Sequence, residues 1–231
     1  MLTITKRLTF LTGRAQVFGF SSYQKMKEAL SKNLYSIELI NKQVNRRILA
    51  MAYSPGVGAV CEAVQDDPIQ ADKMTLRSRA VAVVTDGRFL DASPQGAGPA
   101  MDWIIAQIKY YSGLDPFPFI IEKEANWELV AKDLAISYGT ILDLDGRGPI
   151  NIPEDLLLVN HQDIVGVAGC EVTDAHKSAN VLGHLVKAGT KGVANKDQIR
   201  EGLEKEEIIF KEFKYYDKLI KDGRDVYTHS L

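Results

Sequence analysis

The chain has 231 residues, of which 45% are hydrophobic and 25% charged, and these proportions are typical of a globular protein. Its formal net charge of -2 gives no overall attraction to nucleic acid or to an anionic membrane, so we expect neither as a partner. Two cysteines, Cys61 and Cys170, are too few for a disulfide scaffold or a four-ligand zinc site, and their apolar settings predict buried, inert thiols. No stretch reaches the roughly 20 consecutive apolar residues that a transmembrane helix requires.

The N-terminal segment carries basic residues without acidic ones. The first acidic residue is Glu28, and Ser, Thr and aromatic residues accompany the earlier positive charges, which are Lys6, Arg7, Arg14, Lys25 and Lys27. This composition is typical of a mitochondrial transit peptide. We therefore predict a presequence-like basic arm over 1–22 and a mitochondrial protein on the matrix side, with a plain basic arm as the alternative.

Helical segments are expected before the first strand. Apolar residues at three- and four-residue steps predict a helix over 23–39. The segment 45–51 is expected to form a short helix or turn. A further short helix is predicted over 57–65, and the acidic pair with the following proline over 66–68 ends it.

A continuous, valine-rich apolar run over 80–84 predicts a strand that is buried on both faces of a parallel sheet. Helices and strands then alternate. Helices are expected over 100–111, 127–137 and 178–188, strands over 117–121 and 140–144, and candidate further strands over 156–159 and 164–167. Such alternation implies βαβ crossovers. The predicted fold class is therefore α/β, with a small, mostly parallel sheet flanked by helices.

The C-terminal segment 198–221 has the pattern of a charged, amphipathic helix with an apolar stripe among Lys and Glu residues. The pattern leaves open whether this helix docks on its own domain or on another protein. We divide the chain into the basic arm, 1–22, a central domain, 23–190, and a C-terminal helical extension, 191–231.

Five motifs follow one another along the central domain. They are Ala52-Tyr-Ser-Pro-Gly-Val57, Cys61-Glu-Ala-Val-Gln-Asp-Asp-Pro68, Val81-Ala-Val-Val-Thr-Asp-Gly87, Ser112-Gly-Leu-Asp-Pro-Phe-Pro118 and Asp174-Ala-His-Lys-Ser-Ala179. In order and spacing, this set resembles the N-terminal domain of malic enzymes. The resemblance implies the α/β fold of that domain and, as the activity of the family, oxidation and decarboxylation of malate with a divalent metal and a nicotinamide cofactor.

The resemblance also assigns catalytic positions, and one of them is replaced. Tyr53 matches the tyrosine that acts as a general acid. Ile104 stands where the family has its lysine base, and an isoleucine side chain cannot accept a proton. Lys109, five positions further on, projects from another face of the expected helix and is a poor substitute. Arg88 lies one position from the arginine that binds the substrate carboxylate, so that role is not transferred to it.

The metal site that the resemblance implies is incomplete. The family binds Mg²⁺ or Mn²⁺ through a Glu-Asp pair after a strand and a later aspartate, because such cations prefer oxygen ligands. Here Leu144 replaces the glutamate, Asp145 keeps the aspartate and Asp174 matches the third ligand. Strand alternation would point Asp143 where Asp145 points, which makes Asp143 a candidate replacement. We expect no bound metal.

No nicotinamide cofactor is expected either. The Gly-x-Gly pairs at 56–58 and 96–98 lack a third glycine, and neither follows a strand directly, as a phosphate-binding turn requires. Where malic enzymes continue into a Rossmann domain, the predicted charged helix follows instead.

These replacements predict a catalytically inactive malic enzyme-like domain, a pseudoenzyme. We expect it to be a structural or accessory subunit of a mitochondrial assembly, such as a respiratory or ATP synthase complex. Its partners would be other protein subunits, bound through the N-terminal arm and the C-terminal helix. Two alternatives stay open: a dicarboxylate- or metal-binding sensor built around Tyr53, Asp145 and Asp174, and a metal-dependent malate or oxaloacetate decarboxylase whose cofactor domain is supplied in trans.

Overall fold

The computed structural model describes residues 21–22, 24–25, 45–52, 56–148, 150–168 and 175–199. The chain forms two compact units, Met1–Lys42 and Gln43–Leu231. The sheet and the helices around it belong to the second unit. The helices predicted over 23–39 and 198–221 lie outside the described residues, apart from 24–25 and 198–199.

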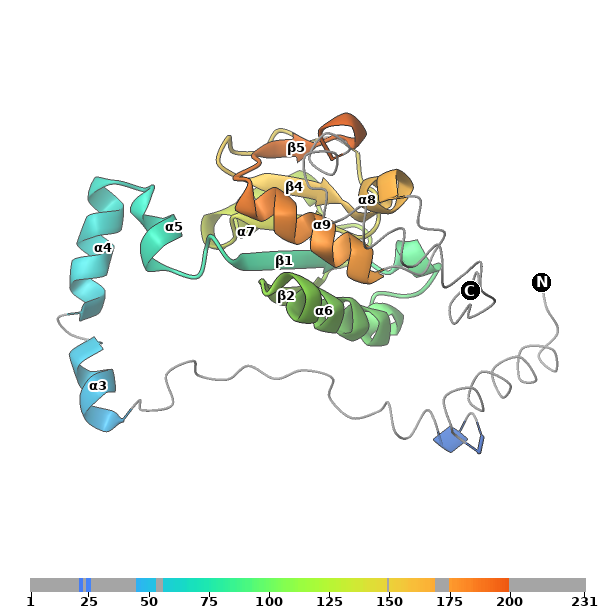
Figure 1. Cartoon of the computed structure of the whole chain (residues 1–231), viewed down its shortest axis with the longest axis horizontal. Helices are drawn as coiled ribbons and strands as arrows, with labels where there is room; N and C mark the ends of the chain where they lie inside the picture. Colours follow the sequence, from blue (N-terminus) through green and yellow to red (C-terminus); the bar gives the residue numbers. More distant parts are fainter. Residues whose placement is uncertain are drawn as a thin grey trace. The chain divides into compact units, whose positions relative to one another are not determined.

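A five-stranded sheet forms the centre of the second unit (Figure 1). Its strands are β1 (Ala80–Thr85), β2 (Asp115–Ile120), β3 (Thr140–Asp143), β4 (Leu157–Asn160) and β5 (Gly192–Ala194). The strand order is β2-β1-β3-β4-β5, and each neighbouring pair is parallel. The predicted α/β class with a small, mostly parallel sheet is therefore confirmed.

The strand order buries β1 and exposes β2. All six residues of β1 are buried, because β2 and β3 flank it and helices cover both faces, as its continuous apolar run predicts. β2 lies at the edge of the sheet, where Pro116 and Pro118 are tolerated because one side of an edge strand needs no ladder hydrogen bonds. β2 begins at Asp115, two residues before the predicted 117.

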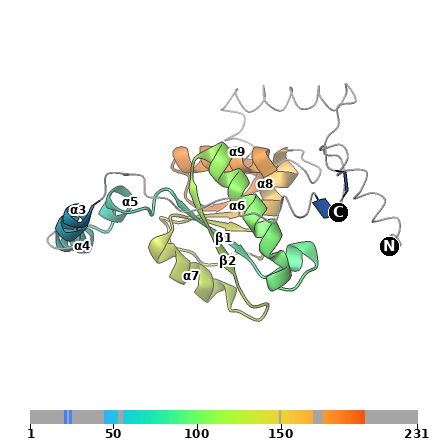
Figure 2. The same ribbon diagram turned by 90° about the horizontal axis from the view of Figure 1, so that it is seen from below.

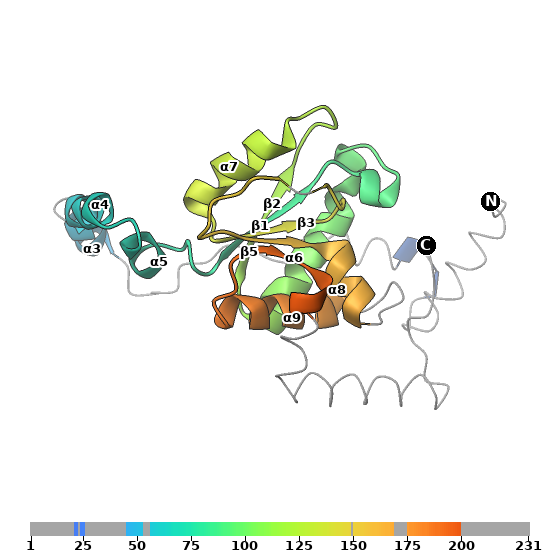
Figure 3. The same ribbon diagram turned by 90° about the horizontal axis from the view of Figure 1, so that it is seen from above.

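Helices cover both faces of the sheet (Figures 2 and 3). α7 (Trp127–Ser137) lies on one face, and α6 (Gly98–Ser112), α8 (His161–Ala168) and α9 (Ala175–Lys187) lie on the other. The core on the α7 face consists of small and branched apolar side chains, namely Ala82, Val84, Ala131, Ala135, Ile141, Leu156 and Leu158. On the opposite face α6 and α9 approach closely, since a Cβ atom on Gly183 would lie 2.9 Å from the Cβ atom of Ser112.

Single residues determine where α7 begins and where α6 ends. The Asn126 side chain accepts a hydrogen bond from Leu129 N, 3.1 Å away, and begins α7 as an N-cap. Gly113, with φ 69°, ends α6 in the left-handed region that glycine adopts readily. Among the helices that the structure describes, none is both long enough and apolar enough to cross a membrane.

Two differences from the predicted elements occur after β4. The segment 164–167, predicted as a candidate strand, belongs to α8, because a short apolar run alone does not distinguish a strand from a buried helix. The Asn160 side chain accepts a hydrogen bond from Gln162 N, 2.9 Å away, at the start of that helix. The short β5 was not predicted, and it lies in the segment assigned to the C-terminal extension.

Three helices precede the sheet: α3 (Arg46–Met51), α4 (Val57–Asp66) and α5 (Gln70–Met74). The first two confirm the short helices expected over 45–51 and 57–65. None of the three has a buried residue. Cys61 on α4 is exposed, so the prediction of a buried thiol is wrong for this cysteine, while Cys170 lies outside the described residues.

A buried arginine connects α5 with the rest of the domain. The guanidinium of Arg77 forms ion pairs with Asp72 and Asp155, each at 2.5 Å, and donates to the carbonyl oxygen of Ala135 at 3.3 Å. Asp72 belongs to α5, Ala135 to α7, and Asp155 to the loop before β4. One side chain therefore links three segments that are distant in sequence.

Candidate functional site

The carboxyl ends of β1, β3 and β4 meet at one edge of the sheet. The chain leaves β1 through α6 to reach β2 on one side, and it returns through α7 to β3 on the other side of β1. This reversal of strand order is a topological switch point, and open α/β sheets bind their ligands outside the carboxyl ends of the strands at such a point. The candidate site is therefore the edge formed by 85–89, 143–147 and 160–161.

A tight turn follows β1 and depends on Gly87. Its φ of 92° is unfavourable for residues with a Cβ atom, and a Cβ atom there would lie 2.6 Å from the carbonyl oxygen of Ser93. The Gly87 N–H donates to Thr85 Oγ1 at 2.9 Å, which closes the turn. The next residues form the short 3₁₀ helix η2 (Arg88–Leu90).

The carboxylate of Asp145 holds this turn against the end of β3. It accepts hydrogen bonds from Thr85 Oγ1 at 2.9 Å, from Asp86 N at 2.8 Å and from Phe89 N at 3.1 Å. Three donors from one turn thus converge on one carboxylate. These hydrogen bonds fix the Asp145 carboxylate at the end of β3. The same carboxylate also forms an ion pair with Arg147.

The guanidinium of Arg147 lies among three carboxylates. Its Nη1 is 2.6 Å from Asp143 Oδ1, and its Nη2 is 2.5 Å from Asp145 Oδ2 and 3.2 Å from Asp86 Oδ2. The ring of Trp127 covers it, with the guanidinium carbon 4.7 Å from the ring centroid. We call Asp86, Asp143, Asp145 and Trp127 the Arg147 cage. The shared contact with Arg147 confirms that Asp143 and Asp145 point to the same side.

Arg88 is the exposed cation of the edge. Its Nε is 3.0 Å from Asp86 Oδ1 and its Nη2 is 2.6 Å from Asp86 Oδ2, so the pair is bidentate. Nη2 also donates to the carbonyl oxygen of Lys123 at 3.3 Å. The Arg88 side chain is 51% exposed, whereas that of Arg147 is 7% exposed. Arg88 therefore presents positive charge to solvent from a fixed turn.

Burial and the two arginines shift the pKa values of the edge in different directions. Burial alone would raise the pKa of Asp86, but the hydrogen bonds from Arg88 and Arg147 and the charge of Arg147 outweigh it, so the pKa lies below its ordinary value. For Asp143, burial dominates and raises the pKa despite the nearby Arg147 charge. Burial lowers the pKa of His161 to about 4, so its imidazole is neutral near pH 7.

His161, the first residue of α8, has one unusual atom. Within the described part of the chain, its Nδ1 is buried and has no hydrogen-bond partner. Buried polar atoms are normally paired, because leaving one unpaired costs about 1–3 kcal/mol. His161 follows β4 directly and thus stands at the same sheet edge as the Arg147 cage.

The structure places the positions named by sequence reasoning in different environments. Ile104 is buried on α6, and Leu144 is fully buried directly after β3, with its N–H donating to Val84 O at 3.0 Å. Asp145 is at the edge, as described. Tyr53 and Asp174 lie outside the described residues.

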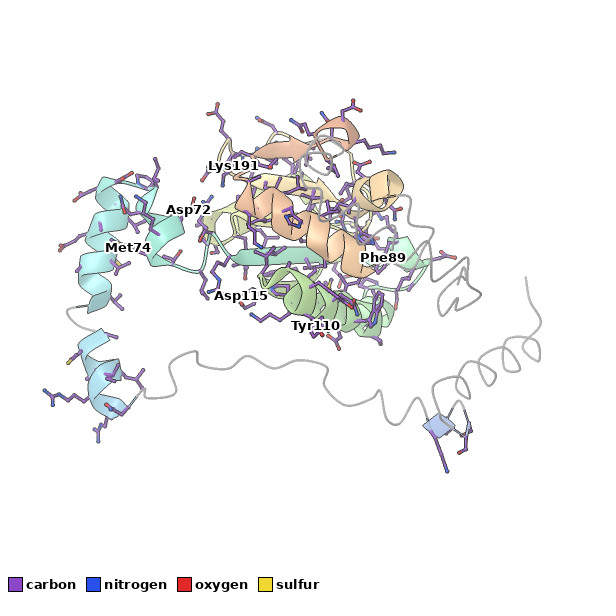
Figure 4. All side chains as sticks on the ribbon, viewed as in Figure 1. Asp72, Met74, Phe89, Tyr110, Asp115 and Lys191 are labelled. Carbon is purple, nitrogen blue, oxygen red and sulfur yellow. The ribbon has the colours of Figure 1, made fainter. Side chains whose placement is uncertain are left out.

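Lys109 is far from this edge along the sheet. It forms an ion pair with Asp115, the first residue of β2, whose partner in the register is Ala80, the first residue of β1. Figure 4 shows Asp115 and Phe89 towards opposite ends of β1. Lys109 is therefore an ion-paired lysine at the amino end of β2.

The described residues do not fit a divalent metal. Among them, no group of three or more His, Cys, Asp or Glu side chains is placed to hold one. The carboxylates of the Arg147 cage instead contact guanidinium and backbone donors. The Gly-x-Gly pairs fit a dinucleotide no better, because 56–58 lies at the start of α4 and 96–98 at the start of α6, not in a turn after a strand.

Sequence reasoning missed Asp86, Arg147 and His161 as members of the site. The available signal was their position, since each lies at or just after the carboxyl end of an expected parallel strand. Asp86 was noticed only as part of a motif, and Arg147 was not noticed because no motif contains it.

Comparison with known proteins gives a consistent family likeness over part of the chain. No protein-family model matches. The chain is 33% identical over 99 residues to an NAD-dependent malic enzyme of Geobacillus stearothermophilus, covering 40% of this chain and 21% of that protein. It is 38% identical over 82 residues to an NAD-dependent malic enzyme of Rhizobium meliloti, covering 34% of this chain and 11% of that protein. The matches thus span about a fifth or less of these curated relatives.

A solved structure agrees with these relatives. The crystal structure of an NAD-dependent malic enzyme from Thermotoga maritima superimposes with a TM-score of 0.50 and 28% identity, over 63% of this chain and 42% of that one. The parallel sheet with helices on both faces is therefore shared with a malic enzyme. The chain contains a malic enzyme-like domain, as the five motifs predict.

The prediction that the chain is not an enzyme is contradicted by these comparisons. The proteins that it resembles are named as malic enzymes, and nothing in the structure shows inactivity. The prediction relied on two replaced positions, Ile104 and Leu144, found by counting along the chain, and on the expected absence of a nicotinamide-binding domain. The carboxylates of Asp86, Asp143 and Asp145 nevertheless lie together at this edge. The edge therefore keeps ionisable groups although Leu144 stands at one acidic position of the family.

Proposed function

We propose that the chain binds a C4 dicarboxylate of the malate type at the carboxyl edge of the sheet and contributes this domain to malic enzyme chemistry. The nicotinamide-binding domain would come from another polypeptide or from another part of a longer chain. The observation that carries the proposal is the half-exposed guanidinium of Arg88 at the switch point, in a chain similar to malic enzymes.

Two positive features of this edge suit the two carboxylates of such a ligand. Asp86 and the carbonyl oxygen of Lys123 hold Arg88 in place through Nε and Nη2, so a ligand carboxylate would bind at Nη1. The second feature is the N-terminus of α6, a 15-residue helix whose N-cap, Ala97, makes no side-chain cap bond among the described residues. A helix N-terminus carries partial positive charge. At the start of α6 this charge is the attraction, because the Gly98 N–H donates to Gln95 O and Pro99 has no N–H.

The two features are held near each other by a short connection. The loop after η2 returns to the turn, since Ala92 N donates to Gly87 O at 3.0 Å. Ala97 N donates to Ser93 O at 3.2 Å, just before α6 begins. The dicarboxylate would therefore bind between the turn after β1 and the start of α6.

In this proposal the described residues bind and orient the substrate. Asp145 and Arg147 keep the turn rigid, so Arg88 loses little conformational freedom when a ligand binds. Tyr53, at the general-acid position of the resemblance, would protonate the enolate that decarboxylation leaves. A nicotinamide cofactor, bound by the other domain, supplies the hydride acceptor.

Isothermal titration of the purified chain with malate tests the binding step. Arg88→Ala should weaken malate binding at least about tenfold, because a hydrogen bond to a charged group contributes about 1.5–3 kcal/mol. Arg79→Ala is the matched control, since the Arg79 side chain is also paired with an aspartate and is 50% exposed. Arg79 directly precedes β1, so it lies at the amino end of the strand, away from the proposed ligand. Absence of binding by the wild-type chain at millimolar malate, or equal losses in both variants, would contradict the proposal.

Oxaloacetate decarboxylation by the purified chain tests the catalytic step separately. Tyr53→Phe should slow carbon dioxide release by roughly 10²-fold, the lower end of the effect of losing a general acid, with unchanged malate affinity. A Tyr53→Phe variant that is as fast as the wild type would remove Tyr53 from the mechanism.

A second role, as a subunit of a mitochondrial assembly, is favoured by the helices before the sheet. Leu49 and Met51 are each 58% exposed and Ile69 is 68% exposed, although large apolar side chains gain free energy when a partner covers them. The partners would be other protein subunits, and the N-terminal arm and the C-terminal helix would extend the contact.

Native gels of mitochondrial extracts test the assembly role. The tagged chain should migrate with a larger complex, and the triple variant Leu49→Gln, Met51→Gln, Ile69→Gln should leave it. Leu129→Gln with Ile136→Gln is the control, because both side chains are equally apolar and exposed but lie on α7. A wild-type chain that migrates as a monomer would exclude this role.

A further inference from the structure

We propose that the guanidinium of Arg147 is the permanent cation among the buried carboxylates of Asp86, Asp143 and Asp145, and that it stands in for a divalent metal ion beside Asp145. Arg147 neutralises these carboxylates whether or not a dicarboxylate binds to Arg88. This neutralisation gives a physical reason why the described residues do not fit a metal.

The charges around Arg147 require a cation at this position. The side chains of Asp86, Asp143 and Asp145 are 1%, 3% and 0% exposed, so water does little to stabilise their negative charges. Buried carboxylates need a partner of opposite charge, because an unpaired one is costly. Arg147 contacts all three through its two terminal nitrogens, in the way a metal ion is shared by several oxygen ligands.

The backbone of Arg147 is hydrogen-bonded to one of the carboxylates that its guanidinium contacts. The N–H of Arg147 donates to Asp143 Oδ2 at 2.7 Å, while Nη1 of the same residue contacts Asp143 Oδ1. The chain turns back between these residues at Gly146, whose φ is 69°. Asp145 N donates to Asp143 Oδ1 at 3.1 Å within the same turn. Arg147 is therefore fixed at both its backbone and its charged group.

Trp127 closes the remaining side of the cage. Its ring covers the guanidinium at 4.7 Å, and the Arg147 side chain is only 7% exposed. An aromatic face suits a planar guanidinium and offers no oxygen ligand to a hard metal ion. This side of the cage therefore favours arginine over a metal.

Removing the guanidinium should convert the cage into a metal site. Arg147→Ala leaves the buried carboxylates of Asp143 and Asp145 without their cation, while Asp86 keeps its pair with Arg88. A divalent ion with oxygen ligands can neutralise the charge that Arg147 no longer balances. The wild-type cage should exclude the ion, since Arg147 already occupies the space and satisfies the charge. The same metal should thus affect the variant and not the wild type.

Tryptophan fluorescence reports on the cage directly. The chain has two tryptophans, Trp103 and Trp127, so a Trp103→Phe background leaves Trp127 as the single emitter. In that background Arg147→Ala should show saturable quenching by Mn²⁺ with a midpoint below about 1 mM, reversed by excess Mg²⁺. The parent with Arg147 intact should show no saturable quenching.

Two further variants identify the ligands. Adding Asp143→Asn to Arg147→Ala should weaken Mn²⁺ binding at least about tenfold, because one charged ligand is lost. Arg79→Ala should show no quenching, since it removes an equally charged side chain that faces a single aspartate at the other edge. The melting temperature of Arg147→Ala should rise with Mn²⁺, by mass action.

Several results would overturn the inference. One is saturable Mn²⁺ quenching in the parent that Asp143→Asn abolishes, because a metal would then displace Arg147 in the native protein. Another is an Arg147→Ala variant that neither quenches nor gains stability with Mn²⁺. If Arg147→Ala folds only when Mn²⁺ is present, the result supports the inference. Arg147→Lys keeps the positive charge, so this variant should fold without metal and show no quenching.

Discussion

Gly87 is required by both the backbone angle and the space around it. Gly87→Ala would place a Cβ atom 2.6 Å from Ser93 O at a φ of 92°, so we expect a loss of at least about 2 kcal/mol in unfolding free energy. Gly58→Ala should instead leave stability unchanged or raise it by about 0.5–1 kcal/mol, because Gly58 is helical and a Cβ atom there meets nothing within 4 Å. Urea unfolding of both variants measures the difference.

His161 should make stability depend on pH below neutrality. Its pKa in the folded chain is about 4, lowered from an ordinary value of 6.5, so the unfolded chain binds the proton first as pH falls. The stabilisation is fully present above pH 6.5 and is lost as pH falls through about 4, by up to about 3 kcal/mol. Urea unfolding at several pH values between 7 and 4 measures this loss.

His161→Leu is the comparison for the pH experiment. It removes both the titrating group and the unpaired Nδ1 atom, so the variant should be at least as stable at pH 7 and should lose less stability on acidification. Other ionisable groups titrate equally in both proteins, and the difference between the two curves isolates His161. Parallel curves would show that burial does not shift its pKa.

The site residues show what a single sequence can reveal at this scale. Asp145 was placed at the edge from a family pattern, but its three contacts with the turn after β1 depend on pairing between residues about 60 positions apart. Arg147 was missed because no motif contains it, although Asp143 and Asp145 lie within four residues of it. A guanidinium has no preferred partner in a sequence, and only folding brings Asp86 to within 3.2 Å of it.

At the scale of elements, Arg77 connects α5, α7 and the loop before β4. Arg77→Ala should lower the free energy of unfolding by about 2–3 kcal/mol, because it leaves Asp72 and the carbonyl oxygen of Ala135 without their partner. The partial exposure of Asp72 and Asp155 keeps the expected loss below that of a fully buried pair. Thermal and urea unfolding measure it.

Arg79→Ala provides the control at the neighbouring position. Its ion pair with Asp115 is half-exposed on the arginine side, so we expect a loss of no more than about 1 kcal/mol. Equal losses in the two variants would show that the buried contacts of Arg77 contribute nothing beyond a surface ion pair.

Elements with long or distinctive patterns were predicted correctly. β1 was identified from its valine-rich run, and α6 and α7 agree with the helices predicted over 100–111 and 127–137. The segment 164–167 was assigned to the wrong class, because four apolar residues satisfy both a strand and a helix. β5 was missed because it has only three residues. Its extended conformation depends on pairing with β4 more than on its own composition.

For the whole molecule, the division into two compact units predicts that the second is independent. The fragment Gln43–Leu231 contains the sheet and its helices, so it should fold alone with a melting temperature within a few degrees of the whole chain. Circular dichroism of the fragment and of the whole chain measures this. A fragment that fails to fold would show that the first unit is part of the same cooperative structure.

The sequence by itself determined the α/β class, the buried central strand and the likeness to malic enzymes, because these depend on local periodicity and on short motifs. The tertiary structure decided which charges meet at the carboxyl edge. Strand order brings β1 beside β3, and this pairing adds Asp86 to the guanidinium that Asp143 and Asp145 contact from the same turn. Charge neutralisation in a buried site depends on distances in space, and no spacing along the chain encodes those distances.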